Sequence, residues 1–310
     1  MQNLYWRTND QTRTLIEKPF QTEAEMEKYI FDNQDLLGDV SVIYRQIKTG
    51  QKQGIPDMLG ADQDGRICII ELKNQLADEN ILPQVLGYAI WAETNPDSIK
   101  AIWLESKHRP ENIVIDWDNL DIRVILIAPS FKNTVPRMAI KMGYPIDLFQ
   151  IKRYSFEDNE FIAVEVVEEA PQLKITTTKG VTIWDWDYYE SEHGKDATQQ
   201  FRQAVEAIDA FVKKQGWNLP HNLNKYYTGF KLGNRVVFNV AWGGTKAWKV
   251  KFKLPKEIIS GFKGKHWEFQ NYDDAFGEAI FRPLKSQSPD ISELQDFFAE
   301  AYKRVSGVAL

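Results

Sequence analysis

The sequence predicts two domains, a mixed α/β domain in the first half and a smaller α+β domain in the second. The chain has 310 residues, which is more than the roughly 100 to 200 of a typical single domain. Residues 1–170 hold 18 Lys and Arg against 28 Asp and Glu, while residues 171–310 hold 20 against 16. The net charges are therefore −10 and +4. The segment EEAPQLKITTTKG differs in composition from its surroundings, so we place a linker over 169–195, between domains at 1–168 and 196–310.

Composition excludes several classes of protein. Hydrophobic residues make up 43% and charged residues 26%, as in a folded globular chain. No apolar run approaches the roughly 18 residues of a membrane span, and the first residues lack the apolar core of a signal peptide, so we expect a cytoplasmic protein without a membrane partner. The single cysteine, Cys68, excludes an internal disulfide and a Cys-rich zinc site. The four histidines have no zinc-ligand spacing, and no Gly-rich phosphate loop or Ser/His/Asp elbow is present.

The first half predicts a sheet flanked by helices. Phe20, Met26 and Ile30 recur near a 3.6-residue period, which indicates a helix with Thr22 as its N-cap. A second helix is expected from Pro83 to Glu93. Five β-rich runs are expected as strands: Val42–Ile47, Ile55–Ala61, Arg66–Leu72, Ala101–Leu104 and Val124–Ala128. The turn sequence DQDG predicts that the second and third of these runs form a hairpin.

The second half shows longer helical periodicity around a small sheet. Apolar residues from Phe201 to Val212 predict one helix, and those from Ile291 to Val305 predict a C-terminal helix. Between them lies a strand pair broken by Gly243 and Gly244. This order of elements is typical of an α+β domain.

Acidic and basic side chains converge on the predicted hairpin. Alternation along Ile69–Lys73 places Glu71 and Lys73 on one face, and Asp57 on the neighbouring strand can reach the same point. Burying such charges costs several kcal/mol unless they are paired or face a polar site. Two carboxylates form a hard-oxygen site suited to Mg²⁺ or Mn²⁺, and a nearby ammonium can orient a metal-activated water. These are the groups needed to hydrolyse a phosphodiester.

The same residues carry a family resemblance. Pro56-Asp57 and Glu71-Leu72-Lys73 resemble the motif of the PD-(D/E)xK nuclease superfamily. Within it, the segments TEAEMEKYIFDNQDLLG, GIPDMLGADQDGRICIIELKN and QVLGYAIWAE resemble the nuclease domain of the endonuclease NucS family over about residues 20–150. The resemblance implies a restriction-endonuclease-like mixed sheet flanked by helices and a Mg²⁺- or Mn²⁺-dependent endodeoxyribonuclease.

The resemblance also implies roles for individual residues. Asp57, Glu71 and the backbone carbonyl of Leu72 would bind the metal, and Lys73 would position the attacking water. Glu23 resembles the additional acidic residue of the family.

The resemblance extends to the second predicted helix but not to the domains outside the nuclease region. Gln84 and Tyr88 resemble its Q-x-x-x-Y motif. The N-terminal DNA-binding domain of NucS has no counterpart here and the C-terminal module differs, so substrate and cleavage pattern are not implied.

Structural roles remain open for each of these residues. Asp57 could be an ordinary turn residue, and Glu71 with Lys73 could form a salt bridge on an edge strand, although apolar neighbours on both faces argue against an edge. For the acid on the first helix, Glu25 and Glu27 are alternatives to Glu23. Gln84 and Tyr88 could simply cover a helix face.

The second half carries a concentrated positive charge. Ten Lys and Arg lie between residues 225 and 265, with Glu257 as the single acid. Strict alternation from Trp248 to Leu254 predicts three lysines on an outer face that could track phosphates. The predicted nucleic-acid contacts are Lys246, Lys249, Lys251 and Lys253. The structural alternative is a solvated strand whose lysines discourage edge pairing.

Together these features predict a metal-dependent endonuclease that cuts DNA, with the basic domain holding the substrate. A non-catalytic nucleic-acid-binding protein that retains a nuclease fold is the main alternative, and an adaptor for an acidic protein is a third. The sequence leaves open the choice between DNA and RNA, the structure of the substrate and whether the chain forms a homodimer.

Overall fold

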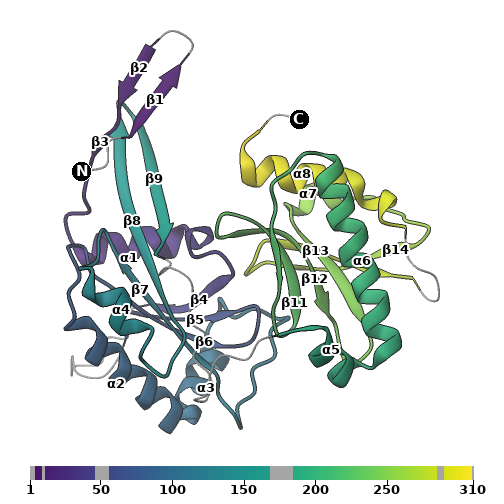
Figure 1. Cartoon of the computed structure of the whole chain (residues 1–310), viewed down its shortest axis with the longest axis horizontal. Helices are drawn as coiled ribbons and strands as arrows, with labels where there is room; N and C mark the ends of the chain where they lie inside the picture. Colours follow the sequence, from purple (N-terminus) through teal and green to yellow (C-terminus); the bar gives the residue numbers. More distant parts are fainter. Residues whose placement is uncertain (1–3, 9–10, 46–55, 168–183, 285–289, 309–310) are drawn as a thin grey trace.

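The computed structural model describes residues 4–8, 11–45, 56–167, 184–284 and 290–308. In these residues the strands form a seven-stranded mixed sheet, a six-stranded antiparallel sheet and a two-stranded ribbon (Figure 1). We call the two larger ones the first and second sheets. The first sheet has the order β3 (Ile16–Glu17), β8 (Ile146–Phe156), β7 (Ile122–Ala128), β6 (Ile67–Leu72), β5 (Met58–Asp62) and β4 (Val40–Arg45), with β9 (Asn159–Val166) paired to β8.

Helices cover both faces of the first sheet, as the sequence predicts. Strand β6 is buried along its whole length, because its alternate side chains enter two different cores. Helix α1 (Glu23–Asp32) packs on one face, and its N-cap Thr22 accepts the backbone N–H of Glu25 at 3.1 Å. The opposite face is covered by α2 (Ile81–Thr94), α3 (Pro96–Glu105) and α4 (Thr134–Ala139).

The predicted hairpin is confirmed, and one predicted strand is wrong. Strands β5 and β6 are antiparallel, and β6 runs parallel to β7. Residues 101–104, expected as a strand, belong to helix α3 instead. Pro96 stands in the first turn of this helix, and Ile99 and Trp103, one turn apart, are buried on its inner side. The start of the run expected from Ile55 and the end of the run expected to Ile47 lie outside the described residues.

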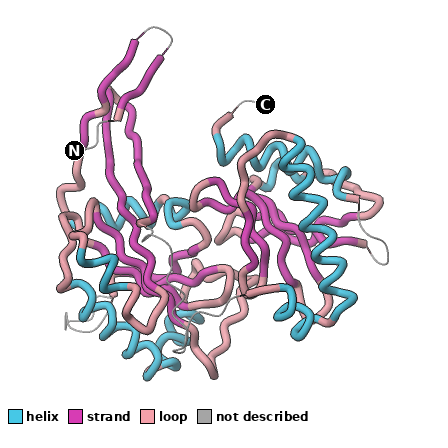
Figure 2. The backbone as a smooth tube through the Cα atoms, viewed as in Figure 1, coloured by secondary structure: helices cyan, strands magenta, loops and turns pink. Residues whose placement is uncertain are grey.

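Strands β8 and β9 continue beyond the body of the first sheet as a long hairpin (Figure 2). The ribbon of β1 (Tyr5–Thr8) and β2 (Gln11–Thr14) lies at its tip, where Trp6 contacts the rings of Phe156 and Phe161 with centroids 5.6 and 5.7 Å apart. We call β8, β9 and this ribbon the arm. Because β8 runs parallel to β7 and β6, the arm rises from the edge at which these strands end.

The second sheet has two long helices on one face. Its strands follow the order β10 (His221–Leu223), β11 (Tyr227–Leu232), β12 (Arg235–Trp242), β13 (Trp248–Lys253), β15 (Glu278–Pro283) and β14 (Trp267–Asp273). The predicted helices are present as α6 (Lys195–Lys214) and as the 3₁₀ turn η2 (Ile291–Leu294) followed by α8 (Gln295–Ser306). The short helix α7 spans Lys256–Ile259. No helix of the described chain is long and apolar enough to cross a membrane.

Part of the segment expected as a linker is helical. Helix α5 spans Trp186–His193, and its Tyr189 is fully buried in the core of the second sheet. Residues 168–183 lie outside the described part of the chain. The second core therefore includes residues that precede position 196, while the division into domains remains a prediction.

The three alternating lysines of β13 do not form an outer face, so this expectation is wrong. Lys249 and Lys251 are only 8% and 3% exposed. The Lys251 ammonium lies 3.4 Å from the buried Glu278 carboxylate, and Lys253 lies 3.4 Å from Asp35 of the first domain. Alternation along β13 correctly separates two faces. It does not reveal that the first domain covers the polar one.

Buried hydrogen bonds join the two domains across this face. The Tyr227 hydroxyl donates to Asp39 at 2.8 Å, and the Gln63 amide donates to Glu278 at 2.9 Å. The Asn239 amide donates in turn to Gln63 at 3.2 Å. Burial alone would raise the pKa of Asp39, but the Arg123 guanidinium outweighs it and the pKa lies well below its usual range. Asp39 thus stays ionised and accepts hydrogen bonds from both domains.

We expect Lys251→Met to lower the free energy of unfolding by about 3–5 kcal/mol, because it leaves the Glu278 carboxylate buried without its cation. Urea unfolding of the whole chain measures this loss. The control is Lys246→Met, which changes an exposed lysine in the turn before β13 and should stay within about 0.5 kcal/mol of the parent. Equal stability of both variants would show that the ion pair is not buried as described.

The carboxyl of Asp64 makes stability depend on pH. Burial, and then the neighbouring Asp62, raise its pKa to about 7, although it accepts the backbone N–H of Tyr226 at 3.2 Å. Between its unfolded pKa of 3.8 and about 7, the folded chain binds this proton more tightly than the unfolded chain does. Stability should therefore fall as the pH rises from 5 to 7.5.

Replacing Asp64 by Asn should make that decline shallower by up to about 1.4 kcal/mol per pH unit. Urea unfolding at a series of pH values measures the slope. The decline should not vanish, because burial also raises the pKa of Glu71 to about 7. An identical slope in the parent and the variant would contradict the assignment to Asp64.

Candidate active site

The predicted catalytic residues meet where β6 ends. Glu71 is the penultimate residue of β6 and is 2% exposed. Asp57 directly precedes β5, and its Oδ2 accepts the backbone N–H of Leu72 at 2.9 Å. Because β5 runs antiparallel to β6, the start of one strand lies beside the end of the other. The hairpin therefore brings two carboxylates together, as the sequence predicts.

Oxygen Oε1 of Glu71 is held by two donors. The Lys73 ammonium donates to it at 2.9 Å, and the Gln84 amide donates to it at 2.7 Å. The same amide nitrogen lies 2.8 Å from the Tyr88 hydroxyl, one turn further along α2. Gln84 and Tyr88 thus attach α2 to the end of β6 and fix the orientation of the Glu71 carboxyl.

The three glutamates at the start of α1 have different neighbours. The Glu23 carboxylate is about half exposed and lies 3.8 Å from the Lys73 ammonium. Glu25 instead pairs with Arg153 at 2.8 Å, and Glu27 lies 3.4 Å from Arg45. Glu23 is therefore the residue of α1 that the structure brings to Lys73.

The site has a feature that a divalent cation would satisfy. Oxygen Oε2 of Glu71 is buried without a hydrogen-bond partner, which is a costly state for a carboxylate. Burial and the nearby Asp57 raise the pKa of Glu71 to about 7, while Lys73 opposes this rise. Two carboxylates and the Leu72 carbonyl fit Mg²⁺ or Mn²⁺, which keep several waters and take one or two carboxylates. The residues present therefore fit the implied metal.

The structure offers few side chains as ligands for a metal ion at this site. In the described part of the chain, no group of three or more His, Cys, Asp and Glu is placed to hold a metal ion. A cation held by Asp57 and Glu71 would need backbone carbonyls, waters or substrate oxygens for its remaining ligands.

The lysines predicted to contact nucleic acid lie elsewhere. The second domain contacts the first domain near the turn between β5 and β6, where Gln63 and Asp64 bond to it. Glu71 lies at the other end of β6. Of the four predicted lysines, Lys246 is exposed, in the turn between β12 and β13. The structure therefore does not bring these lysines to the carboxylates.

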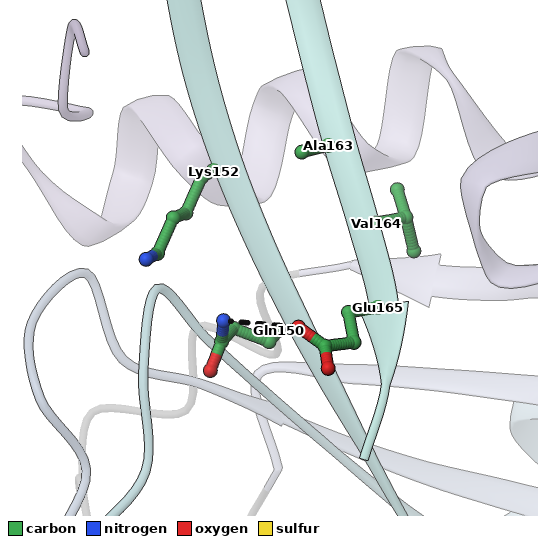
Figure 3. Close-up of a pocket in the computed structure, with 5 residues that line it drawn as sticks. All are labelled: Gln150, Lys152, Ala163, Val164 and Glu165. Atoms are coloured by element: carbon green, nitrogen blue, oxygen red, sulfur yellow. Dashed lines mark hydrogen bonds between the residues drawn. The ribbon is translucent and has the colours of Figure 1, made fainter. Parts of the chain in front are cut away.

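A hollow at the root of the arm was not predicted from the sequence (Figure 3). Its lining comes from β8 and β9 and consists of Gln150, Lys152, Ala163, Val164 and Glu165. One signal was available, because polar Gln150 and Lys152 alternate with buried Phe149 and Ile151. Such alternation indicates a strand with one accessible face.

Comparison with known proteins gives matches to part of the chain. No family model matches the chain. Over 123 residues the chain is 30% identical to Endonuclease NucS from Pyrococcus horikoshii and from Pyrococcus abyssi, which covers 39% of this chain and 39% of each relative. The chain thus matches about two fifths of the length of these relatives. An uncharacterised protein of Haemophilus influenzae matches over 241 residues at 22% identity, covering 73% of this chain and 76% of that protein.

Solved structures of similar proteins also match less than half of the chain. A structure of EndoMS with double-stranded DNA is 28% identical, covers 41% of this chain and 44% of its own, and has a TM-score of 0.29. A repair endonuclease from Pyrococcus abyssi is 29% identical, covers 42% and 47%, and has a TM-score of 0.27. The sequence matches confirm the predicted resemblance to NucS as a distant similarity confined to part of the chain.

Proposed function

We propose that the chain is a metal-dependent endonuclease that hydrolyses phosphodiester bonds of DNA. The observation that carries the proposal is the buried Glu71 carboxyl, which has one oxygen held by Lys73 and Gln84 and the other without a partner, beside Asp57. The partial similarity to Endonuclease NucS supports the reaction class. The choice of DNA over RNA is part of the proposal and is tested with the substrates named below.

The chain's own residues would position the metal and the substrate. Asp57, Glu71 and the Leu72 carbonyl would hold Mg²⁺ or Mn²⁺, which when bound supplies an activated water and neutralises phosphate charge. Burial lowers the pKa of Lys73, but the Glu71 carboxylate outweighs this effect and raises it overall, so the amine stays protonated at neutral pH. Lys73 can then orient the attacking water and stabilise negative charge that develops on the phosphate.

The sequence-based alternative, a non-catalytic nucleic-acid-binding protein, fits the site less well. Two converging carboxylates repel a phosphate unless a cation lies between them. A protein that only binds nucleic acid has no use for such a pair beside its ligand. The similarity to NucS covers only two fifths of the chain, so the activity of the whole relative is not transferred.

Replacing Glu71 by Ala should abolish cleavage that depends on Mg²⁺ or Mn²⁺, because one of the two metal-binding carboxylates is lost. Lys73→Ala should lower kcat by about 10²–10³, the usual effect of removing one donor to the reacting group. Cleavage is measured on labelled duplex, mismatched, branched and single-stranded DNA, with RNA as a further substrate. DNA binding by both variants should persist.

The matched control for this experiment is Glu105→Ala, which removes an exposed acid at the end of α3 and should leave cleavage unchanged. Cleavage by Glu71→Ala at the parent rate would refute the proposed mechanism. Absence of metal-dependent cleavage by the parent on every substrate would refute the proposed function.

Metal binding has a second readout that does not depend on activity. A ligand that binds only the folded chain stabilises it by about 2.7 kcal/mol at 100 times its Kd. Mg²⁺ or Mn²⁺ should therefore raise the Tm of the parent and of Glu105→Gln, and have a much smaller effect on Asp57→Asn and Glu71→Gln. Equal metal-induced shifts in all four proteins would place the cation away from these carboxylates.

A further inference from the structure

The hollow at the root of the arm lies on the same face of the first sheet as the candidate active site. Glu71 pairs in register with Leu126 of β7, which pairs with Leu148 of β8. Gln150 and Lys152 follow Leu148 by two and four residues, so their side chains share its face. The hollow therefore faces the same side as Glu71 and lies nearer the tip of the arm.

Strand geometry gives the separation between the two places. Two strand spacings and two residues of advance put the Cα atoms of Glu71 and Gln150 about 12 Å apart. One strand of duplex DNA carries a phosphate every ~3.4 Å along the helix axis. Measured along the helix axis, Gln150 is about three to four nucleotides from a phosphate bound at Glu71, and Lys152, at about 16 Å, is about five.

The charges in the hollow favour an anion at one end. Gln150 donates to Glu165 at 3.4 Å across the β8–β9 pair, and Figure 3 shows Lys152 extending away from Glu165. No ion pair or hydrogen bond joins the Lys152 ammonium to another described residue. The next residue, Arg153, is buried on the opposite face and pairs with Glu25. Lys152 is therefore the cation that β8 presents to a ligand on the active-site face.

We propose that Lys152 binds a backbone phosphate of the cleaved DNA strand, a few nucleotides from the scissile bond, and that Gln150 lies beside the same backbone. This inference rests on the proposed nuclease function and adds to it a positioning residue outside the metal site. Glu165 borders the hollow and opposes the phosphate by charge repulsion. The affinity for DNA should thus fall when the Lys152 ammonium is removed and rise when the Glu165 carboxylate is removed.

The test measures binding of labelled duplex DNA in EDTA at several salt concentrations. Lys152→Ala should weaken binding and reduce the slope of log K against log salt by about 0.9, the value for one phosphate contact. Lys152→Arg should restore the slope, and Glu165→Gln should tighten binding. The control Lys107→Ala removes an exposed charge beyond α3 and should leave the slope unchanged.

Kinetics in Mg²⁺ provide the second arm. Lys152→Ala should raise KM with kcat unchanged, because the contact is made equally in the ground state and the transition state. Lys152→Gln keeps a long polar side chain and should behave like Lys152→Ala, which separates loss of charge from loss of folding. If the parent cleaves while both variants keep its salt slope and KM, the phosphate site is wrong and the nuclease proposal stands. If the parent cleaves no nucleic acid, the nuclease proposal fails. In that case the phosphate site is also refuted if DNA binding by Lys152→Ala depends on salt with the same slope as binding by the parent.

Discussion

The candidate site depends on one constraint, the burial of an acidic side chain at the end of a strand that is apolar on both faces. Strand β6 places its residues alternately into two cores, so neither face offers water to Glu71. The surrounding elements supply two donors, Lys73 after the strand and Gln84 from α2, while Asp57 before the paired strand adds a second negative charge. Only one Glu71 oxygen is compensated. The site differs from the buried ion pair of Lys251 and Glu278 in that a second carboxylate, Asp57, lies beside the uncompensated oxygen.

The unequal charges of the two halves have a different meaning in the structure from the one the sequence suggests. An acidic half and a basic half predict a polyanionic partner for the basic one. In the structure, part of this complementarity is used within the chain, since Asp35 pairs with both Arg235 and Lys253. These partly exposed pairs contribute little stability. The buried contacts of Asp39 and Glu278 fix the geometry of the interface, because such groups must find partners when water is removed.

Sequence patterns correctly predicted the parts of the fold that depend on interactions between residues close together in the chain. The hairpin, the N-cap at Thr22 and the residues around Glu71 follow from alternation, turn chemistry and spacing, and the structure contains them. Helix α3 was missed because its apolar residues form a short run that fits a strand as well as a helix. The burial of Lys249 and Lys251 and the position of the arm arise from contacts between segments far apart in the sequence. No local pattern contains that information.

The candidate active site and the basic strand β13, which the sequence predicts to act together, lie toward opposite ends of β6. Its six residues, at about 3.3 Å each, put the domain interface roughly 16 Å from the carboxylates. The lysines of β13 lie on the interface side and are covered, so they cannot hold DNA at the carboxylates while the domains stay docked. The arm rises from the other edge, where β6 and β7 end. A DNA strand bound at Glu71 and directed along β8 would therefore pass Gln150 and Lys152, which β8 presents on the same face of the sheet.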